Sequence, residues 1–212
     1  MTMMQHDPIE PWRLRIDANC QRRALSDDPL DGLRHWHYAL VVPDPRESGP
    51  DLVVARADLY FLDPNDVEDD PAETIEEESA DLAPFGALYL PGGLFNSDEV
   101  EVYGQTLLIA DRVEVAPGYR GRSYGPWLLA EAIADLMAQS SIVGVLPAPY
   151  ELGDPRTYDS VEYEAARDRL RALWARLGFE PEGDSIMVMV NPSVDEFRST
   201  VLAGLRARVL SV

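Results

Sequence analysis

Residues 105–137 read QTLLIADRVEVAPGYRGRSYGPWLLAEAIADLM, and they contain a strand, a short loop and a helix in direct succession. The apolar run between Gln105 and Pro117 is typical of a central strand. Beyond the loop, apolar residues recur at helical spacing and predict a helix with one broad core-facing side, formed by Leu128, Leu129, Ala132, Ile133, Leu136 and Met137. This strand–loop–helix unit indicates both the fold class and the kind of ligand that the protein binds.

The loop between this strand and this helix is rich in glycine and arginine, which predicts an anion site. Backbone N–H groups at a helix start lack intrahelical partners and lie at the positive end of the helix dipole, so a phosphate can bind several of them. Gly121 and Gly125 let the main chain approach a ligand, and Arg120 and Arg122 add positive charge. Pro126 costs no hydrogen bond in a first helical turn. A Gly-x-Gly-x-x-Gly dinucleotide site fits less well because the spacing differs; a surface turn without a ligand is the other alternative.

Further strands and helices are predicted on both sides of this unit. Strand patterns occur in WRLRI (12–16), LRHWHYALVV (33–42), DLVVARADLYFL (51–62), SIVGVLPAP (141–149) and SIMVMVN (185–191). A helix is predicted in VEYEAARDRLRALWARLGF (161–179), with Gly178 at its end. A C-terminal helix over about 193–210 places on one face Val194, Phe197, Val201, Leu205 and Val209. That helix either caps the core or meets a partner, so a homodimer stays open.

The chain is expected to form a single domain over residues 1–212. Residues 63–81, DPNDVEDDPAETIEEESAD, contain many carboxylates and few apolar side chains, which predicts an exposed acidic loop insertion with room for one helical turn. A Ca2+ loop is the alternative, but the ligand spacing and central glycine of an EF-hand are missing.

Composition excludes several classes of protein. The chain is 46% hydrophobic and 26% charged, values typical of a globular fold. Cys20 is the only cysteine, so neither an intrachain disulfide nor a cysteine-based zinc site can form. A secretory signal is missing, and no apolar stretch approaches the roughly 18 residues that span a bilayer. We therefore expect a cytoplasmic protein.

The protein is strongly acidic, with 18 Lys and Arg against 38 Asp and Glu and a formal net charge of −20. Such a charge repels phosphate backbones and anionic lipids, so we expect neither a nucleic-acid nor a membrane partner. It attracts a cationic substrate such as an amine or a basic peptide. The alternative interpretation is that the negative charge only keeps the protein soluble and has no relation to a substrate.

At Arg120-Gly121-Arg122-Ser123-Tyr124-Gly125 the chain resembles the GNAT superfamily of acyl-coenzyme A-dependent N-acyltransferases. The family signature is Arg or Gln, two residues, Gly, one residue, then Gly or Ala. Ser123 stands in place of the usual first glycine, and serine is a good helix N-cap. The resemblance extends over about 105–191, including the segments around ARDRLRALWARLGFEP and SIMVMVN.

The resemblance implies an α/β (α+β) fold: a mixed, twisted, mostly antiparallel central sheet flanked by helices, with a splayed strand pair that holds coenzyme A (CoA). Acetyl-CoA or another acyl-CoA is the implied co-substrate, with its phosphates at the loop and its pantetheine arm on the main chain of Val113, Glu114 and Val115. Without that ligand, the strand is simply part of a buried parallel sheet.

The function implied by the resemblance is transfer of an acyl group to an amine of a small molecule or a peptide. Family members often use a tyrosine acid four residues before a Gly-Phe pair, and Trp174 occupies that position before Gly178-Phe179. Indole does not act as an acid, so another group or water protonates the thiolate, or catalysis has lapsed. We expect Trp174 to pack beside the CoA thiol, with a core position as the alternative. A catalytically silent acyl-CoA-binding regulator and an interaction domain that keeps only the fold stay open.

Asp111 is the first candidate for the general base. Strand alternation from Asp111 to Val113 and Val115 places the three side chains on one face, with Glu114 on the other. Burial beside the acyl site would raise the pKa of this carboxyl into a useful range. The alternative is a structural salt bridge to an arginine.

Two histidines and one insertion complete the set of candidate residues. His35 and His37 share a strand face and suit a base or a metal pair, but the sequence shows no third ligand, so no metal site is predicted. Residues 147–161 look like an insertion that lines the acceptor pocket. Its candidate acceptor-binding groups, or plain loop residues, are Tyr150, Glu151, Tyr158 and Asp159.

Overall fold

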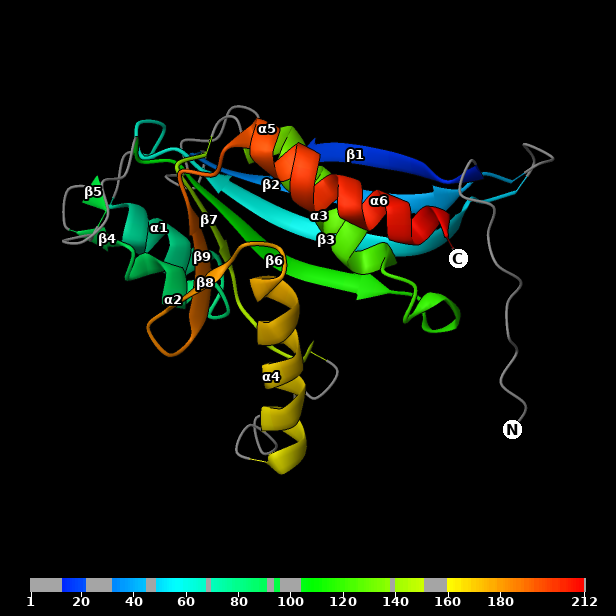
Figure 1. The fold of residues 1–212 in the computed structure, drawn as a ribbon. Helices are drawn as coiled ribbons and strands as arrows, with labels where there is room; N and C mark the ends of the chain where they lie inside the picture. Colours follow the sequence, from blue (N-terminus) through cyan, green and yellow to red (C-terminus); the bar gives the residue numbers. More distant parts are fainter. Residues whose placement is uncertain are drawn as a thin grey trace.

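A seven-stranded sheet forms the centre of the protein (Figure 1). The computed structural model describes residues 13–21, 32–44, 49–67, 70–90, 94–95, 104–137, 140–150 and 160–211. The strands lie in the order β1 (Arg15–Gln21), β2 (Leu33–Val42), β3 (Leu52–Leu62), β6 (Leu107–Val115), β7 (Ile142–Val145), β9 (Ile186–Val190) and β8 (Glu180–Glu182). A separate two-stranded ribbon consists of β4 (Tyr89–Leu90) and β5 (Leu94–Phe95).

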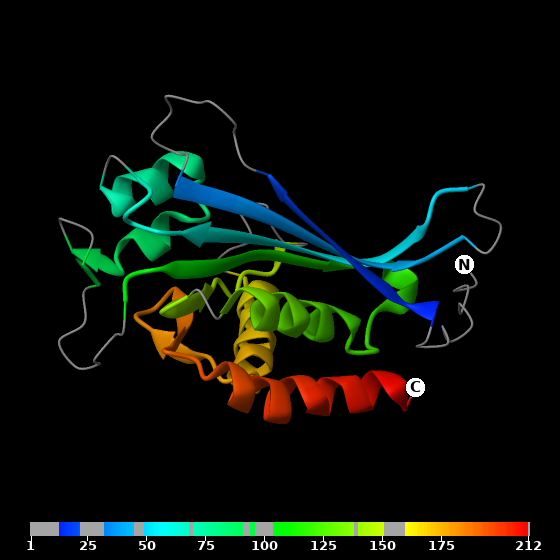
Figure 2. The same cartoon turned by 90° about the horizontal axis from the view of Figure 1, so that it is seen from above.

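Neighbouring strands of this sheet run antiparallel, except that β6 and β7 are parallel. The exception follows from the connection, because a helix, α3 (Tyr124–Leu136), carries the chain from the end of β6 back to the start of β7. The sheet is twisted along its length (Figure 2). The expected fold class, a mixed and mostly antiparallel sheet flanked by helices, is confirmed.

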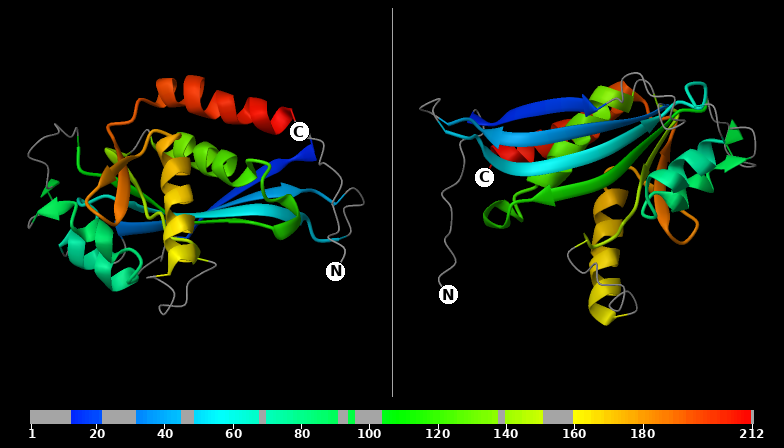
Figure 3. Two further views of the ribbon diagram at one scale, coloured as in Figure 1. Left: turned by 60° about the horizontal axis from the view of Figure 1, so that its bottom comes forward. Right: turned by 180° about the vertical axis from the view of Figure 1, so that it is seen from behind.

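Helices cover both faces of the sheet (Figure 2). On one face lie α3 and a C-terminal helix made of α5 (Val194–Phe197), a π-helical turn (Arg198–Leu202) and α6 (Ala203–Leu210). On the other face lie the short helices α1 (Pro71–Glu78) and α2 (Ala83–Gly86). Helix α4 (Val161–Ala175) runs across the strands instead of along them, beside β6 and β7 (Figure 3). No helix in the described ranges is long and apolar enough to cross a bilayer.

The larger core lies between the sheet and α3. All six apolar residues that predicted this helix are buried, and they pack with strand residues such as Leu40, Leu59 and Leu108. The C-terminal helix covers the outer side of α3 with Phe197 and Leu205, and an Arg206–Glu131 ion pair of 2.7 Å joins the two helices. Within the described chain, this helix therefore caps the core.

The acidic segment 63–81 differs from the expected exposed loop. Asp70 accepts a hydrogen bond from the backbone N–H of Ala72 at 2.9 Å, Pro71 occupies the first turn, and two helical turns follow. Ile75 and Thr74 are buried in a second core, against the face of the sheet opposite to α3. The prediction of an exposed loop was wrong. One apolar residue per turn is enough to pack one side of a short helix against the apolar face of a sheet.

Candidate active site at the β6–β7 fork

Strands β6 and β7 separate part-way along their length. They pair where Leu107–Ala110 of β6 faces Ile142–Val145 of β7. Strand β6 then continues to Val115 without β7 beside it. Beyond this point β3 pairs with one edge of β6, while no described strand pairs with the other. The backbone groups of residues 111–115 on that second edge therefore face an open fork between the two strands.

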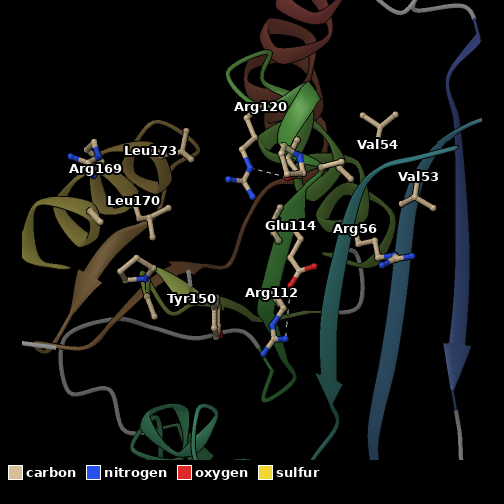
Figure 4. A pocket seen from close by; sticks show the side chains of 18 of the residues that line it. Val53, Val54, Arg56, Arg112, Glu114, Arg120, Tyr150, Arg169, Leu170 and Leu173 are labelled. Carbon is tan, nitrogen blue, oxygen red and sulfur yellow. Dashed lines mark hydrogen bonds and ion pairs between the residues drawn. The ribbon is translucent and has the colours of Figure 1, made fainter. Parts of the chain in front are cut away.

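A cleft of about 1310 Å³ occupies this fork. Its walls are the start of β3, the end of β6, residues 148–150 that follow β7, and one side of α4. Figure 4 shows Leu170 and Leu173 of α4 on one side of the cleft, Glu114 and Arg56 on the strand side, and Tyr150 at its lower end. The cleft is therefore a channel with one helical wall and one strand wall.

Arginines dominate the charge of the cleft. Among the described residues, its lining contains one carboxylate, Glu114, and five arginines: Arg56, Arg112, Arg120, Arg169 and Arg176. This concentration stands out in a protein whose net charge is −20. The Nε of Arg120 donates a hydrogen bond to the carbonyl oxygen of Val115 at 3.0 Å, which holds this guanidinium where β6 ends (Figure 4). The lining suits an anionic ligand.

A splayed strand pair in a mixed sheet, with a basic cleft between the strands, is the arrangement that the resemblance implied. The described strands and helices thus have the arrangement expected of a GNAT-type fold. Two solved structures are similar to it: NAA60 of Arabidopsis thaliana in complex with acetyl-CoA, and AtaTR bound with AcCoA. NAA60 is 13% identical with a TM-score of 0.39, over 75% of this chain and 76% of that chain. AtaTR is 15% identical with a TM-score of 0.41, over 87% and 98%.

No protein-family model matches the chain, and no curated protein sequence matches it. The function proposed below therefore rests on the residues of the cleft.

The loop after β6 holds two residues with positive φ, Gly121 at 77° and Ser123 at 61°. Ser123 occupies the N-cap position of α3, as expected, but its side chain makes no capping hydrogen bond. A left-handed conformation is easy for glycine and costs other residues roughly 1–2 kcal/mol. This conformation explains why the GNAT signature has a glycine at the position that Ser123 occupies in this chain.

Gly125 has a packing role. A Cβ at this position would lie 2.8 Å from Val115 Cγ2 and 3.2 Å from Val113 Cγ1, so only glycine lets the start of α3 pack this closely on β6. Tyr124 is buried in the main core. In the range 120–125, Arg120 borders the cleft, whereas Gly121, Arg122, Ser123, Tyr124 and Gly125 do not line it. Helix–strand contact thus explains Gly125 without a ligand, and close approach to a ligand stays a prediction.

Asp111 lies on the opposite face from the one predicted. In the β3–β6 pairing, Asp58 faces Arg112 and the next residue, Leu59, faces Ala110, so Asp111 forms a β-bulge without a partner on β3. The bulge shifts the side-chain alternation by one. As a result, Ala110, Val113 and Val115 pack on the core under α3, whereas Asp111 continues the face of Ile109, which belongs to the core under α1 and α2.

The bulge places Asp111 at the point where the fork opens, one residue beyond the last β6–β7 pair. The hydroxyl of Tyr150 donates to the backbone oxygen of Asp111 at 2.8 Å, and its distance to Asp111 Oδ1 is 3.4 Å. The guanidinium of Arg112 lies over the Tyr150 ring, 4.7 Å from its centroid. Asp111 forms no ion pair with a described arginine, so this part of the chain does not contain the salt bridge considered as the alternative.

Burial raises the pKa of the Asp111 carboxyl above its ordinary value; Arg112 opposes this effect, and the charge of Asp81 reinforces it. Burial also raises the pKa of the Tyr150 phenol, and the neighbouring Asp111 adds to that shift. Tyr150 is therefore a neutral hydrogen-bond donor at physiological pH. The pair combines a carboxylate with increased proton affinity and a phenol that keeps its proton.

The raised pKa of Asp111 has a consequence for stability. The proton on a carboxyl whose folded pKa is raised stabilises the fold fully below the unfolded pKa, and this contribution is lost as the pH rises through the folded pKa. Ionisation of this partly buried carboxyl therefore costs the folded protein stability as the pH rises. Asp111→Asn is expected to raise Tm by on the order of a few degrees at neutral pH, with the difference vanishing in acid. Thermal unfolding across pH measures this, and an unchanged or lower Tm at neutral pH would contradict it.

Trp174 belongs to the main core and is 6% exposed. Its Nε1 has no hydrogen-bond partner among the described residues. The apolar side chains near the end of this helix divide: Leu170 and Leu173 line the cleft, whereas Trp174, and Leu177 just after α4, belong to the core. Trp174 therefore has the core position that was considered as the alternative. Its contact with a CoA thiol stays a prediction.

Sequence reasoning missed four arginines of the cleft, including Arg112 of β6. Arg169 of α4 and Arg176, the residue directly after this helix, line the cleft together with Leu173. Arginines inside an otherwise apolar helical stripe were the signal available for them. Arg56 comes from β3, far away in the sequence, and no local pattern marks it.

The predicted histidine pair acquires a neighbour that the sequence did not reveal. Asp58 of β3 faces His37 of β2, and its Oδ1 lies 2.7 Å from His37 Nδ1. Burial and the neighbouring His37 lower the pKa of His35. Of the predicted acceptor-binding residues, Tyr150 lines the cleft, whereas Glu151, Tyr158 and Asp159 lie outside the described residues.

Proposed function

We propose that this protein is an acyl-CoA-dependent N-acyltransferase that moves an acyl group, acetyl in the simplest case, to an amine. One observation carries the proposal: the edge of β6 that no described strand pairs opens into a cleft lined, among the described residues, by five arginines and Tyr150. The Tyr150 hydroxyl donates to the backbone oxygen of Asp111, which lies next to this lining. The edge offers main-chain donors and acceptors to an amide-containing chain such as pantetheine. The arginines offer positive charge to the phosphates.

The loop residues support this assignment in a different way from the one first expected. The helix start at Tyr124 still presents N–H groups without intrahelical partners, and Pro126 removes only one of them. Arg120 links that helix start to the open strand edge through its hydrogen bond to Val115. We infer that pyrophosphate binds near Arg120, and that Val113, Glu114 and Val115 bind the pantetheine arm through their main chain.

The groups at the fork suit the proton transfers of this reaction. The acceptor nitrogen forms a bond to the acyl carbon, the carbon–sulfur bond breaks, and the nitrogen loses a proton while the sulfur gains one. Asp111, with its raised pKa, takes the proton from nitrogen. Tyr150 lies at the same position with a phenolic proton to donate to the thiolate. In this way Tyr150 supplies the acid that Trp174 cannot.

Acetyl-CoA binding tests the cleft. Arg120→Glu is expected to weaken binding at least tenfold, about 1.4 kcal/mol or more, because it reverses a charge beside the phosphates. Isothermal titration calorimetry measures the Kd. The matched control is Arg208→Glu on α6, an exposed residue outside the cleft lining, which changes the net charge equally. Equal affinities for the two variants would contradict the assignment.

Release of free thiol across a panel of amines tests catalysis. An acyltransferase releases CoA only when a suitable amine is present, and the cleft variant should lose both binding and release. Tight binding of acetyl-CoA with no release for any amine would favour the catalytically silent regulator instead. Absence of binding would remove both functions.

A further inference from the structure

A second cluster of functional side chains lies outside the cleft, on the face of the sheet covered by α1. His35 and His37 are two residues apart on β2, so both side chains project from one face. Asp58 faces His37 across the β2–β3 pair. None of these three residues lines the acyl-CoA cleft. The cluster therefore needs an explanation of its own.

The two imidazole rings are held in place by their neighbours. Their centroids lie 4.0 Å apart, and His35 stacks on Tyr60 at 4.2 Å. The hydroxyl of Tyr60 donates to Glu78 of α1 at 3.3 Å, which ties the stack to the covering helix. The Asp58 carboxylate hydrogen-bonds His37 Nδ1 at 2.7 Å and orients the second ring. Rings fixed in this way lose little further freedom when they bind a ligand.

The Nε2 atoms of both histidines are buried and have no hydrogen-bond partner among the described residues. Buried polar atoms are normally paired, and leaving one unpaired costs about 1–3 kcal/mol. In the tautomer that donates an Nδ1 proton to Asp58, the Nε2 of His37 offers a lone pair to a ligand. Asp58 Oδ1 holds the His37 ring in this way, and the second carboxylate oxygen, Oδ2, remains to bind an ion.

We propose that His35, His37 and Asp58 form a binding site for a divalent transition-metal ion. Each residue offers one ligand atom, an imidazole nitrogen or a carboxylate oxygen, and the three atoms lie within 4.8 Å of one another. Imidazole and carboxylate ligands suit ions such as zinc and cobalt, whereas calcium and magnesium prefer oxygen alone. Three protein ligands leave a fourth position of a tetrahedral ion open. The site links β2 to β3 and does not depend on the acyltransferase proposal.

Metal titration of the untagged, chelator-treated protein tests the site. Competition between the protein and a chromogenic chelator for Zn2+ measures affinity and stoichiometry, and the visible absorption of bound Co2+ reports ligand geometry. One ion per chain is expected. His35→Gln and Asp58→Asn should each weaken Zn2+ binding at least about tenfold. The matched control is Glu77→Gln, an exposed carboxylate on α1 outside the cluster, which should leave the affinity unchanged.

Thermal unfolding provides a readout that does not depend on activity. Zn2+ should raise the Tm of the wild-type protein and of Glu77→Gln, because an ion that binds the folded state stabilises it. It should raise the Tm of His35→Gln and Asp58→Asn much less, and their metal-free melting shows whether they are folded. His37→Gln replaces any variant that does not fold. Zn2+ affinity equal in wild type and folded histidine variants, or absence of stoichiometric binding, would overturn the proposal.

Discussion

Asp111→Asn is expected to lower the turnover of acyl transfer by roughly 10²- to 10⁴-fold, the range that a general base contributes. The residue lies where the β6–β7 fork opens, and burial raises the pKa of its carboxyl. Asparagine keeps the size of the side chain and can still accept the hydrogen bond of Tyr150, but it does not accept a proton. Steady-state kinetics with acetyl-CoA and an active amine measures the effect.

The pH profile makes this prediction specific. In the wild-type protein, kcat/KM should rise with pH as Asp111 ionises, with a midpoint above the ordinary pKa of an aspartate. In Asp111→Asn the remaining rate should not show this step. Acetyl-CoA affinity should stay within about threefold of wild type, since the mutated group is a base and the phosphates lie elsewhere. Full activity in this variant would remove Asp111 from the mechanism.

Tyr150→Phe should also reduce turnover by roughly 10²- to 10⁴-fold, because it deletes the phenol that we propose as the acid for the departing thiolate. The ring remains in place under Arg112, so cleft packing and acetyl-CoA affinity should change little. The loss should therefore appear in kcat more than in KM. Single-turnover measurement with saturating acetyl-CoA isolates the chemical step.

Two further variants sharpen this experiment. Tyr38→Phe, in the main core away from the cleft, is the matched control and should keep its activity. Tyr150→Phe also removes the hydrogen bond to Asp111, so the double variant with Asp111→Asn measures their coupling. A loss in the double variant close to that of one single variant would show that they act as a pair. Tyr150→Phe with nearly wild-type turnover would show that water protonates the thiolate.

The local patterns of this chain determined its elements. The apolar stripe of 128–137 is buried as predicted, and the helix of 161–179 ends near Gly178, whose φ is 96°. The long apolar run before the loop is strand β6. Periodicity reports which side of an element is apolar, and this information is contained in each segment alone. The GNAT resemblance added a mixed, mostly antiparallel sheet and the expectation of a splayed strand pair.

The candidate site depends on contacts between segments that are distant in sequence. The bulge at Asp111 arises from the register between β3 and β6, and it reversed the face that simple alternation had given this residue. Asp58 meets His37 only through strand pairing, and the cleft collects arginines from β3, β6, the loop and α4. Register and burial are properties of paired strands and packed helices, because a one-residue shift in pairing turns every later side chain to the other face. The sequence alone thus determined the elements, whereas only the tertiary structure decided which of their side chains meet at the fork.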